Sequence, residues 1–157
     1  MKYIIFLYLF FLINCQKKKN DVNIGDITKI IYISDNITYD ITGNFYILDK
    51  RFKNPGQHNL NLNNHDLDLI KSKIIDNDIY KLNDSLEFIK TCKTEGCLSK
   101  INIKYASGRN QYFIFDNLNY RNNFNNKSYK KIISIEEIIG KIIVNNIKEP
   151  EPVNIHL

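Results

Sequence analysis

Thiols and imidazoles are the side chains of this chain best suited to chemistry, and they are few. The sequence holds three cysteines and three histidines in 157 residues. Cys92 and Cys97 lie close together in the sequence and could offer two thiolates to zinc, but no histidine lies at the short spacing from them that zinc sites use. Their spacing is also wider than the Cys-X-X-Cys of redox enzymes. We therefore expect neither a metal site nor a redox-active pair.

The remaining polar residues do not form a recognisable catalytic motif. The Gly-X-Ser-X-Gly turn that carries the nucleophile of many serine hydrolases is absent from the sequence, and so is a calcium-binding loop. Asp66 and Asp68 are two residues apart on an expected helix, so they point to different sides. Six glycines in the whole chain form no phosphate-binding loop. These observations predict a protein that is not an enzyme and that uses no cofactor.

The first fifteen residues have the features of an export signal. Lys2 precedes an apolar run over residues 3–13, and a polar stretch begins abruptly after Cys15. The apolar run is much shorter than the ~20 residues that a membrane-spanning helix needs. An ordinary signal peptide cut elsewhere, or an uncleaved anchor, would share these features.

The tetrapeptide Leu12-Ile13-Asn14-Cys15 resembles the lipobox of bacterial lipoproteins. Asn14 departs from the family, which usually has Gly, Ala or Ser before the cysteine. The resemblance implies that residues 1–14 are removed and that Cys15 carries fatty acyl chains such as palmitate. It implies attachment to a membrane of the bacterial cell envelope. In this family, acidic residues just after the cysteine are linked to surface export, so Lys17–Lys19 imply the periplasmic side.

Positive charge predominates in the chain, which has a formal net charge of +5 and an isoelectric point near 9.0. Such a charge would suit nucleic acid, but an exported protein meets little of it. We expect no nucleic-acid partner. Lys17–Lys19 instead suit anionic lipid head groups, each contributing about 1 kcal/mol, or they simply keep the segment solvated.

With Cys15 assigned to lipid, Cys92 and Cys97 remain as a pair. Outside the cytoplasm, two thiols this close tend to oxidise. Closing so small a ring stabilises the fold by about 2 kcal/mol in the chain-entropy model. We therefore predict a disulfide between them.

Alternating apolar residues and turn signals predict five strands. On the first, Ile27, Ile31 and Ile33 are expected to share one face. The expected strands cover residues 27–33, 37–42, 45–48, 101–105 and 111–115. Residues 50–62, 83–100 and 117–128 are expected to be irregular.

Two helices complete the expected fold. Asn63 and Asp66 predict the start of the first, which ends near Asp76. Ser134 and Glu137 match the capping-box pattern and predict the start of the second. The element order β-β-β-α-β-β-α predicts an α+β fold: an antiparallel sheet of about five strands with both helices packed on one face.

This reading divides the chain into a signal peptide (1–14), a lipidated flexible tether (15–25), a single globular domain (26–148) and an exposed tail (149–157). The layout resembles small uncharacterised lipoproteins of the Bacteroidetes, a likeness that implies no activity. We expect an accessory module that binds another envelope protein or component through its open sheet face or the 117–128 loop. An inhibitor of a hydrolase and a hydrolase with a site dispersed over loops are the alternatives.

Aromatic residues near arginine are the remaining candidates for a binding patch, because tyrosine and arginine are favoured at interfaces. Several of them fall in the second hairpin and in the asparagine-rich loop that follows. The candidate patch comprises Tyr112, Tyr120, Phe124, Arg109 and Arg121.

Overall fold

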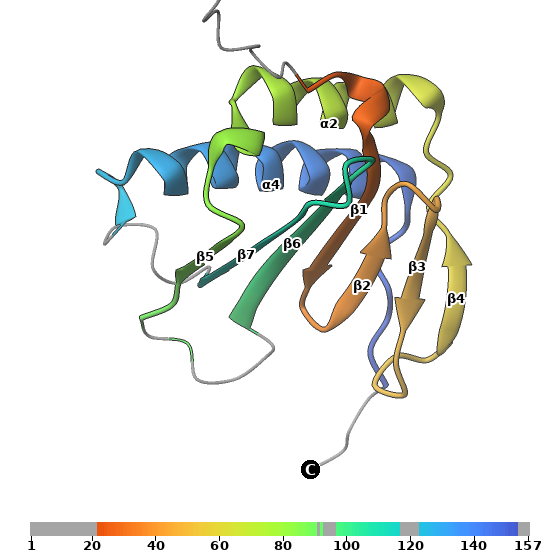
Figure 1. The fold of residues 1–157 in the computed structure, drawn as a ribbon. Coiled ribbons are helices and arrows are strands. Elements are labelled where there is room, and N and C mark those ends of the chain that lie inside the picture. The colour runs from red at the N-terminus through yellow and green to blue at the C-terminus, as the bar shows by residue number, and fades with distance from the viewer. Residues whose placement is uncertain (1–21, 91, 93–96, 117–122, 154–157) are drawn as a thin grey trace, which may run out of the picture.

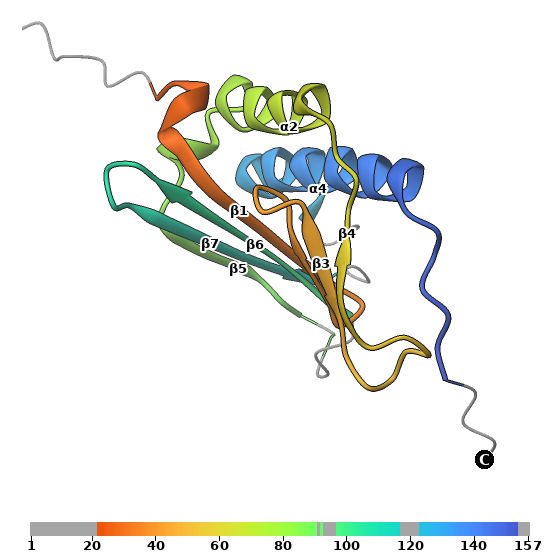
Figure 2. The ribbon, with the colours of Figure 1, turned by 90° about the vertical axis from the view of Figure 1, so that its right-hand side faces the viewer.

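A seven-stranded sheet with two helices on one side forms the part of the chain that the computed structural model describes, residues 22–90, 92, 97–116 and 123–153 (Figures 1 and 2). The strand order is β4-β3-β2-β1-β6-β7-β5. The strands are β1 (Ile27–Ser34), β2 (Ile37–Asp40), β3 (Phe45–Leu48), β4 (Gly56–Asn59), β5 (Ser85–Phe88), β6 (Leu98–Tyr105) and β7 (Asn110–Asp116). The helices are α2 (Asn64–Asp76) and α4 (Lys127–Asn146), with short 3-10 turns η1 (Ile24–Asp26) and η2 (Ile79–Lys81).

The α+β class is confirmed, but the sheet is larger than predicted and is mixed rather than antiparallel. β5 pairs with β7 in parallel, while the other pairs are antiparallel. The expectation of about five strands missed β4 and β5, each of which has only four residues. β4 reads Gly-Gln-His-Asn and has no apolar alternation to reveal it.

A bulge near the start of β1 changes which residues share a face. Ile27 pairs with Tyr105, whereas Lys29 pairs with Lys104, so β1 contains one extra residue at this point. Ile27 and Ile30 are consequently both buried. The expectation that Ile27 shares a face with Ile31 and Ile33 was therefore wrong.

The start of α2 follows the predicted capping arrangement. The Asp66 amide donates to Asn63 Oδ1 over 3.0 Å, and the Asn63 amide donates to Asp66 Oδ2 over 3.3 Å. Each residue satisfies a backbone donor that the first turn of a helix leaves open.

The predicted start of α4 was wrong. Asn126 caps this helix, its Oδ1 accepting from the amides of Ser128 at 2.9 Å and Tyr129 at 3.1 Å. Ser134 lies inside the helix, where its hydroxyl donates to the Lys131 carbonyl over 2.8 Å and accepts from Asn77 of the segment after α2 over 2.5 Å. Serine at this position therefore joins two segments instead of starting a helix.

The core lies between the sheet and the helices, and it is rich in isoleucine. Ile30, Ile101 and Phe113 of the sheet belong to one buried cluster with Ile135 and Ile139 of α4. Burying a side chain of this size contributes roughly 1.5–3 kcal/mol. Past the last turn of α4 the chain runs down beside β3 and β4, where no helix covers the sheet (Figure 2).

In the described part of the chain, neither α2 nor α4 is long and apolar enough to cross a membrane.

Candidate functional site

A pocket of about 470 Å³ opens between β2 and the last turn of α4. This volume lies within the range of small-molecule sites, roughly 300–1,000 Å³. Most of its lining is aliphatic or aromatic, and two carboxylates complete it. The lining residues are Asp35, Ile37, Tyr39, Phe52, Ile143, Val144, Ile147, Glu149 and Pro150.

The segment after α4 forms one wall of this pocket, and it is held against the loop between β3 and β4. The Lys53 ammonium pairs with the Glu151 carboxylate at 2.6 Å, and the Lys53 amide donates to the Glu151 carbonyl over 3.0 Å. The Val153 amide donates to the Arg51 carbonyl over 2.8 Å. Residues 149–153, part of the expected tail, are therefore attached to the body and place Glu149 beside the pocket.

A second hollow of about 260 Å³ lies on the other side of the same segment. Glu149 and Pro150 line both hollows, so they lie between them. The second hollow is more polar than the first. Its other lining residues are Tyr46, Leu48, Asn54, His58, Lys148 and Glu151.

A row of aromatic rings crosses β1, β2, β3 and β4 beneath the two hollows. Tyr32, Tyr39, Tyr46 and His58 are successive cross-strand partners, with ring centroids 5.8, 6.0 and 5.2 Å apart. Tyr39 and Tyr46 each have a ring on both sides. A ligand would therefore meet their edges and hydroxyl groups, since the faces that sugars and bases stack on are taken by neighbouring rings.

The first pocket is lined by two carboxylates, those of Asp35 and Glu149, although the chain as a whole is basic. Asp35 directly follows β1 in a left-handed conformation, with φ of 50°, and accepts a hydrogen bond from the Ser34 hydroxyl over 3.2 Å. Within the described residues, neither Asp35 nor Glu149 forms an ion pair. Burial raises the pKa of Tyr39 to about 12, and the nearby charge of Asp35 adds to the effect. The Tyr39 hydroxyl therefore stays neutral.

Glu136 of α4 adds a further acidic group to this region. Its carboxylate accepts a hydrogen bond from the Tyr32 hydroxyl over 2.9 Å. Burial raises the pKa of Glu136, the hydrogen bond from Tyr32 opposes this, and the charges of Glu137 and Asp35 raise it further. Glu136 therefore senses the charge of Asp35, which lines the pocket.

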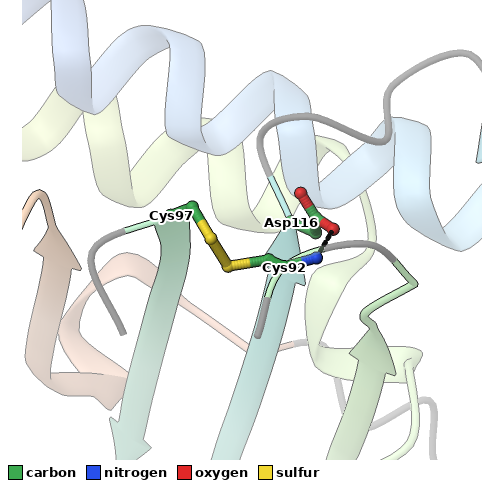
Figure 3. Close-up of a disulfide and its surroundings, with 3 residues drawn as sticks. All are labelled: Cys92, Cys97 and Asp116. Carbon is green, nitrogen blue, oxygen red and sulfur yellow. Dashed lines mark hydrogen bonds between the residues drawn. A yellow bond between two sulfur atoms is a disulfide. The ribbon is translucent and has the colours of Figure 1, made fainter. Parts of the chain in front are cut away.

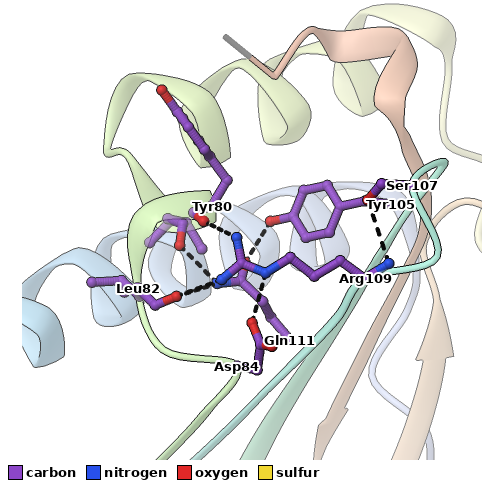
Figure 4. Close-up of polar contacts among 8 residues, drawn as sticks. Tyr80, Leu82, Asp84, Tyr105, Ser107, Arg109 and Gln111 are labelled. Atoms are coloured by element: carbon purple, nitrogen blue, oxygen red, sulfur yellow. Dashed lines mark hydrogen bonds and ion pairs between the residues drawn. The ribbon is translucent and has the colours of Figure 1, made fainter. Parts of the chain in front are cut away.

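Arg109, expected in a binding patch, is instead fully engaged within the protein (Figure 4). Its Nε donates to the Asp84 carboxylate over 2.6 Å, and its Nη2 donates to the Leu82 carbonyl over 2.7 Å. Nη1 donates to the Tyr80 carbonyl. The guanidinium thereby fastens the segment between η2 and β5 to the turn between β6 and β7.

Gln111 extends this arrangement into the core and was not singled out from the sequence. Its Nε2 donates to the carbonyls of Ile79 and Leu82, both over 3.0 Å, and its Oε1 accepts from the Tyr105 hydroxyl over 2.5 Å (Figure 4). A polar residue at an inward position of the expected 111–115 strand was the available signal. A buried amide needs partners for each of its polar atoms.

The other residues of the expected patch lie apart. Tyr112 lies on β7, the strand next to the edge of the sheet, between Asn102 of β6 and Ser85 of β5. Phe124 is 51% exposed and lies ahead of α4. β7, which separates Arg109 from the segment holding Phe124, spans about 20 Å at ~3.3 Å per residue.

Two members of that patch, Tyr120 and Arg121, lie outside the described residues, as do the signal peptide, Cys15 and most of the tether.

The predicted pairing of Cys92 with Cys97 is confirmed by geometry, because their Cα atoms lie 5.9 Å apart in a disulfide (Figure 3). The pair closes the connection from β5 to β6 where it passes the end of β7. The Cys92 amide donates to the buried Asp116 carboxylate of β7 over 2.7 Å. The disulfide and this hydrogen bond fix the crossing that the parallel β5 requires.

Among the described side chains, no three His, Cys, Asp or Glu residues are grouped closely enough to hold a metal ion.

Comparison with known proteins finds no family model, no curated protein and no solved structure that matches this chain.

Proposed function

We propose that this protein is a lipid-anchored protein of the bacterial cell envelope that works as a non-enzymatic binding module. Cys15 would attach it to the membrane on the periplasmic side, and the pocket between β2 and α4 would receive its ligand. The Leu12-Ile13-Asn14-Cys15 tetrapeptide supports the anchor. A tether of about ten residues spans roughly 17 Å as a random coil, which would keep the pocket near the bilayer.

The pocket is the observation that carries the binding role. Val144 at its rim is 76% exposed although its neighbour Ile143 is only 6% exposed. Phe52 across the pocket is half-buried. Covering this apolar surface would gain about 25 cal/mol for each Å² removed from water. A ligand with an apolar part would therefore be stabilised here.

Subcellular fractionation of a Cys15→Ala variant tests the anchor. We expect the wild-type protein in the membrane fraction and the variant outside it, because the acylated sulfur would be lost. Cys97→Ala serves as the matched control and should stay with the membrane. Unchanged fractionation of Cys15→Ala, or an unacylated residue 15 by mass spectrometry, would contradict the anchor.

Site-specific photocrosslinking in cells tests the binding role. A benzophenone amino acid at position 144 would place the reactive group at the pocket rim. The same group at Leu69, a 41% exposed residue of α2, is the control. We expect a light-dependent adduct from position 144 that position 69 does not give. Equal labelling at both positions, or none at 144, would argue against the pocket as the binding site.

A further inference from the structure

We infer that the pocket selects ligands that combine an aliphatic group with a positive charge, an amine or a guanidinium. The inference rests on the proposed binding role and specifies the chemistry of its ligand. Two independent features of the pocket support it: an apolar floor and a rim whose ionised side chains are all acidic.

The apolar part of the pocket comes from three separate segments. Ile37 of β2, Ile143 of α4 and Ile147, which follows the helix, line it, and Phe52 of the loop after β3 completes the wall. Aliphatic side chains dominate, and the ring face of Tyr39 is turned towards Tyr46. Because most of the lining is aliphatic, an aliphatic chain suits this surface.

The charged part of the pocket comes from Asp35 and Glu149. Among the described residues they are its only ionised lining residues, and no lysine or arginine of that part of the chain lines it. Neither forms an ion pair within the described chain. Two carboxylates without a cationic partner beside an apolar surface favour a cationic ligand over a neutral or anionic one of equal shape.

The neighbouring hollow does not reverse this preference. Lys148 lines it, but this side chain is 91% exposed and its ammonium lies 3.9 Å from the Glu151 carboxylate. Glu149 lines both hollows. A fatty acid or another anionic amphiphile would therefore bring its own negative charge against Asp35 and Glu149 in the larger pocket.

Binding of three labelled hexapeptides to the full processed protein in phosphatidylcholine nanodiscs tests the inference. Each peptide has three leucines, and the other three residues are all lysine, all glutamine or all glutamate. Fluorescence anisotropy, with empty nanodiscs as the blank, gives the three affinities. We expect the lysine peptide to bind about fivefold more tightly than the glutamine peptide, and the glutamate peptide to bind most weakly.

Two double variants separate the rim carboxylates from overall charge. Asp35→Asn with Glu149→Gln should abolish the preference for lysine over glutamine. Asparagine tolerates the left-handed backbone at position 35, so the turn should persist. Asp68→Asn with Glu87→Gln removes the same charge from exposed positions away from the pocket and should preserve the preference.

Competition distinguishes two sources of this chemistry. If hexylamine displaces the lysine peptide and hexanoate does not, small amines are ligands too. If neither displaces it, the site takes basic peptide segments. Both results support the inference, whereas displacement by hexanoate alone would overturn it.

The inference and the proposed function can fail separately. Equal binding of all three peptides, lost in Phe52→Ala because this variant removes one apolar wall of the pocket, would overturn the inference and keep the binding role. If no peptide binds while position 144 still gives its specific adduct in cells, the inference is likewise overturned and the binding role is kept. Absence of that adduct would overturn the proposed function itself.

Discussion

The polar side chains differ between the two halves of the sheet, β5, β6 and β7 on one side of β1 and β2, β3 and β4 on the other. On the side of β5, β6 and β7, Arg109 and Gln111 form hydrogen bonds with the segment after α2. On the side of β2, β3 and β4, Asp35 and Glu149 form no ion pair within the described residues. The helices lie over the first group of strands, whereas α4 ends beside the second group and leaves the pocket open there (Figure 2).

The contrast follows from what covers the sheet. Where α2, η2 and α4 exclude water, a polar group without a partner costs about 1–3 kcal/mol, and the buried amide of Gln111 has partners for its oxygen and its nitrogen. Where α4 ends, water remains within reach and unmatched groups cost little. The polar groups of β5, β6 and β7 thus stabilise the fold, whereas Asp35 and Glu149 at the pocket remain available to a ligand.

The largest expected effect is on the covered side. Gln111→Leu would leave the Ile79 and Leu82 carbonyls and the Tyr105 hydroxyl without their partner. We expect the free energy of unfolding to fall by about 3 kcal/mol, measured by urea denaturation. Asn110→Ala at the exposed neighbouring position is the control and should change it by less than about 0.5 kcal/mol. Equal losses for the two variants would remove the contrast.

The disulfide should contribute somewhat less. Replacing Cys92 and Cys97 together by alanine should lower the free energy of unfolding by about 2 kcal/mol, because the small ring no longer restricts the unfolded chain. Reducing the wild-type protein should give a similar loss and should not affect the double variant further. An equal loss on reduction of the double variant, which retains only Cys15, would mean that the loss in the wild-type protein does not come from the Cys92–Cys97 disulfide.

Glu136 gives a smaller effect that depends on pH. Burial raises its pKa in the folded state above the unfolded value, so the ionised form disfavours folding at neutral pH. Glu136→Gln should therefore raise the free energy of unfolding at pH 7. The gain should shrink as the pH falls through the folded-state pKa, because the wild-type carboxyl then becomes neutral.

Denaturation of Glu136→Gln at pH 7 and pH 4 measures this gain. The exposed neighbour Glu137, replaced by glutamine, is the matched control. A gain for Glu136→Gln that is as large at pH 4 as at pH 7 would rule out ionisation as its cause.

The smallest effect is expected at the pocket. Val144→Ser should change the free energy of unfolding by less than about 0.5 kcal/mol, because this side chain is 76% exposed. Ile143→Ser, one residue away and 6% exposed, should cost several times more. If Val144→Ser were as costly as Ile143→Ser, the uncovered side would be contributing to stability after all.

The features that the sequence predicted correctly have local signals. Asn63 and Asp66 are three residues apart and cap α2 directly. Alternating apolar residues marked the hairpin of β6 and β7. Cys92 and Cys97 needed only their short spacing to predict a disulfide.

The features that escaped prediction depend on distant partners. Ser134 has the capping pattern, yet its hydroxyl bonds to Asn77, which is 57 residues away. β5 pairs with β7, and its own alternation of Leu86 and Phe88 with polar residues extends over only four residues, too few to stand out in the sequence. The pocket draws its walls from four separate segments, so Asp35 and Glu149 could not be connected before the fold was known.

β1 enters the sheet directly after residue 26 and has a hydrogen-bonded neighbour on each side, β2 and β6. Any pulling force transmitted along the preceding chain therefore acts on a central strand held by two ladders rather than on an edge strand held by one. To extract β1, such a load would have to break both ladders and separate the two groups of strands that β1 joins. Tension from that end is thereby shared across the body before it can reach the pocket beside α4.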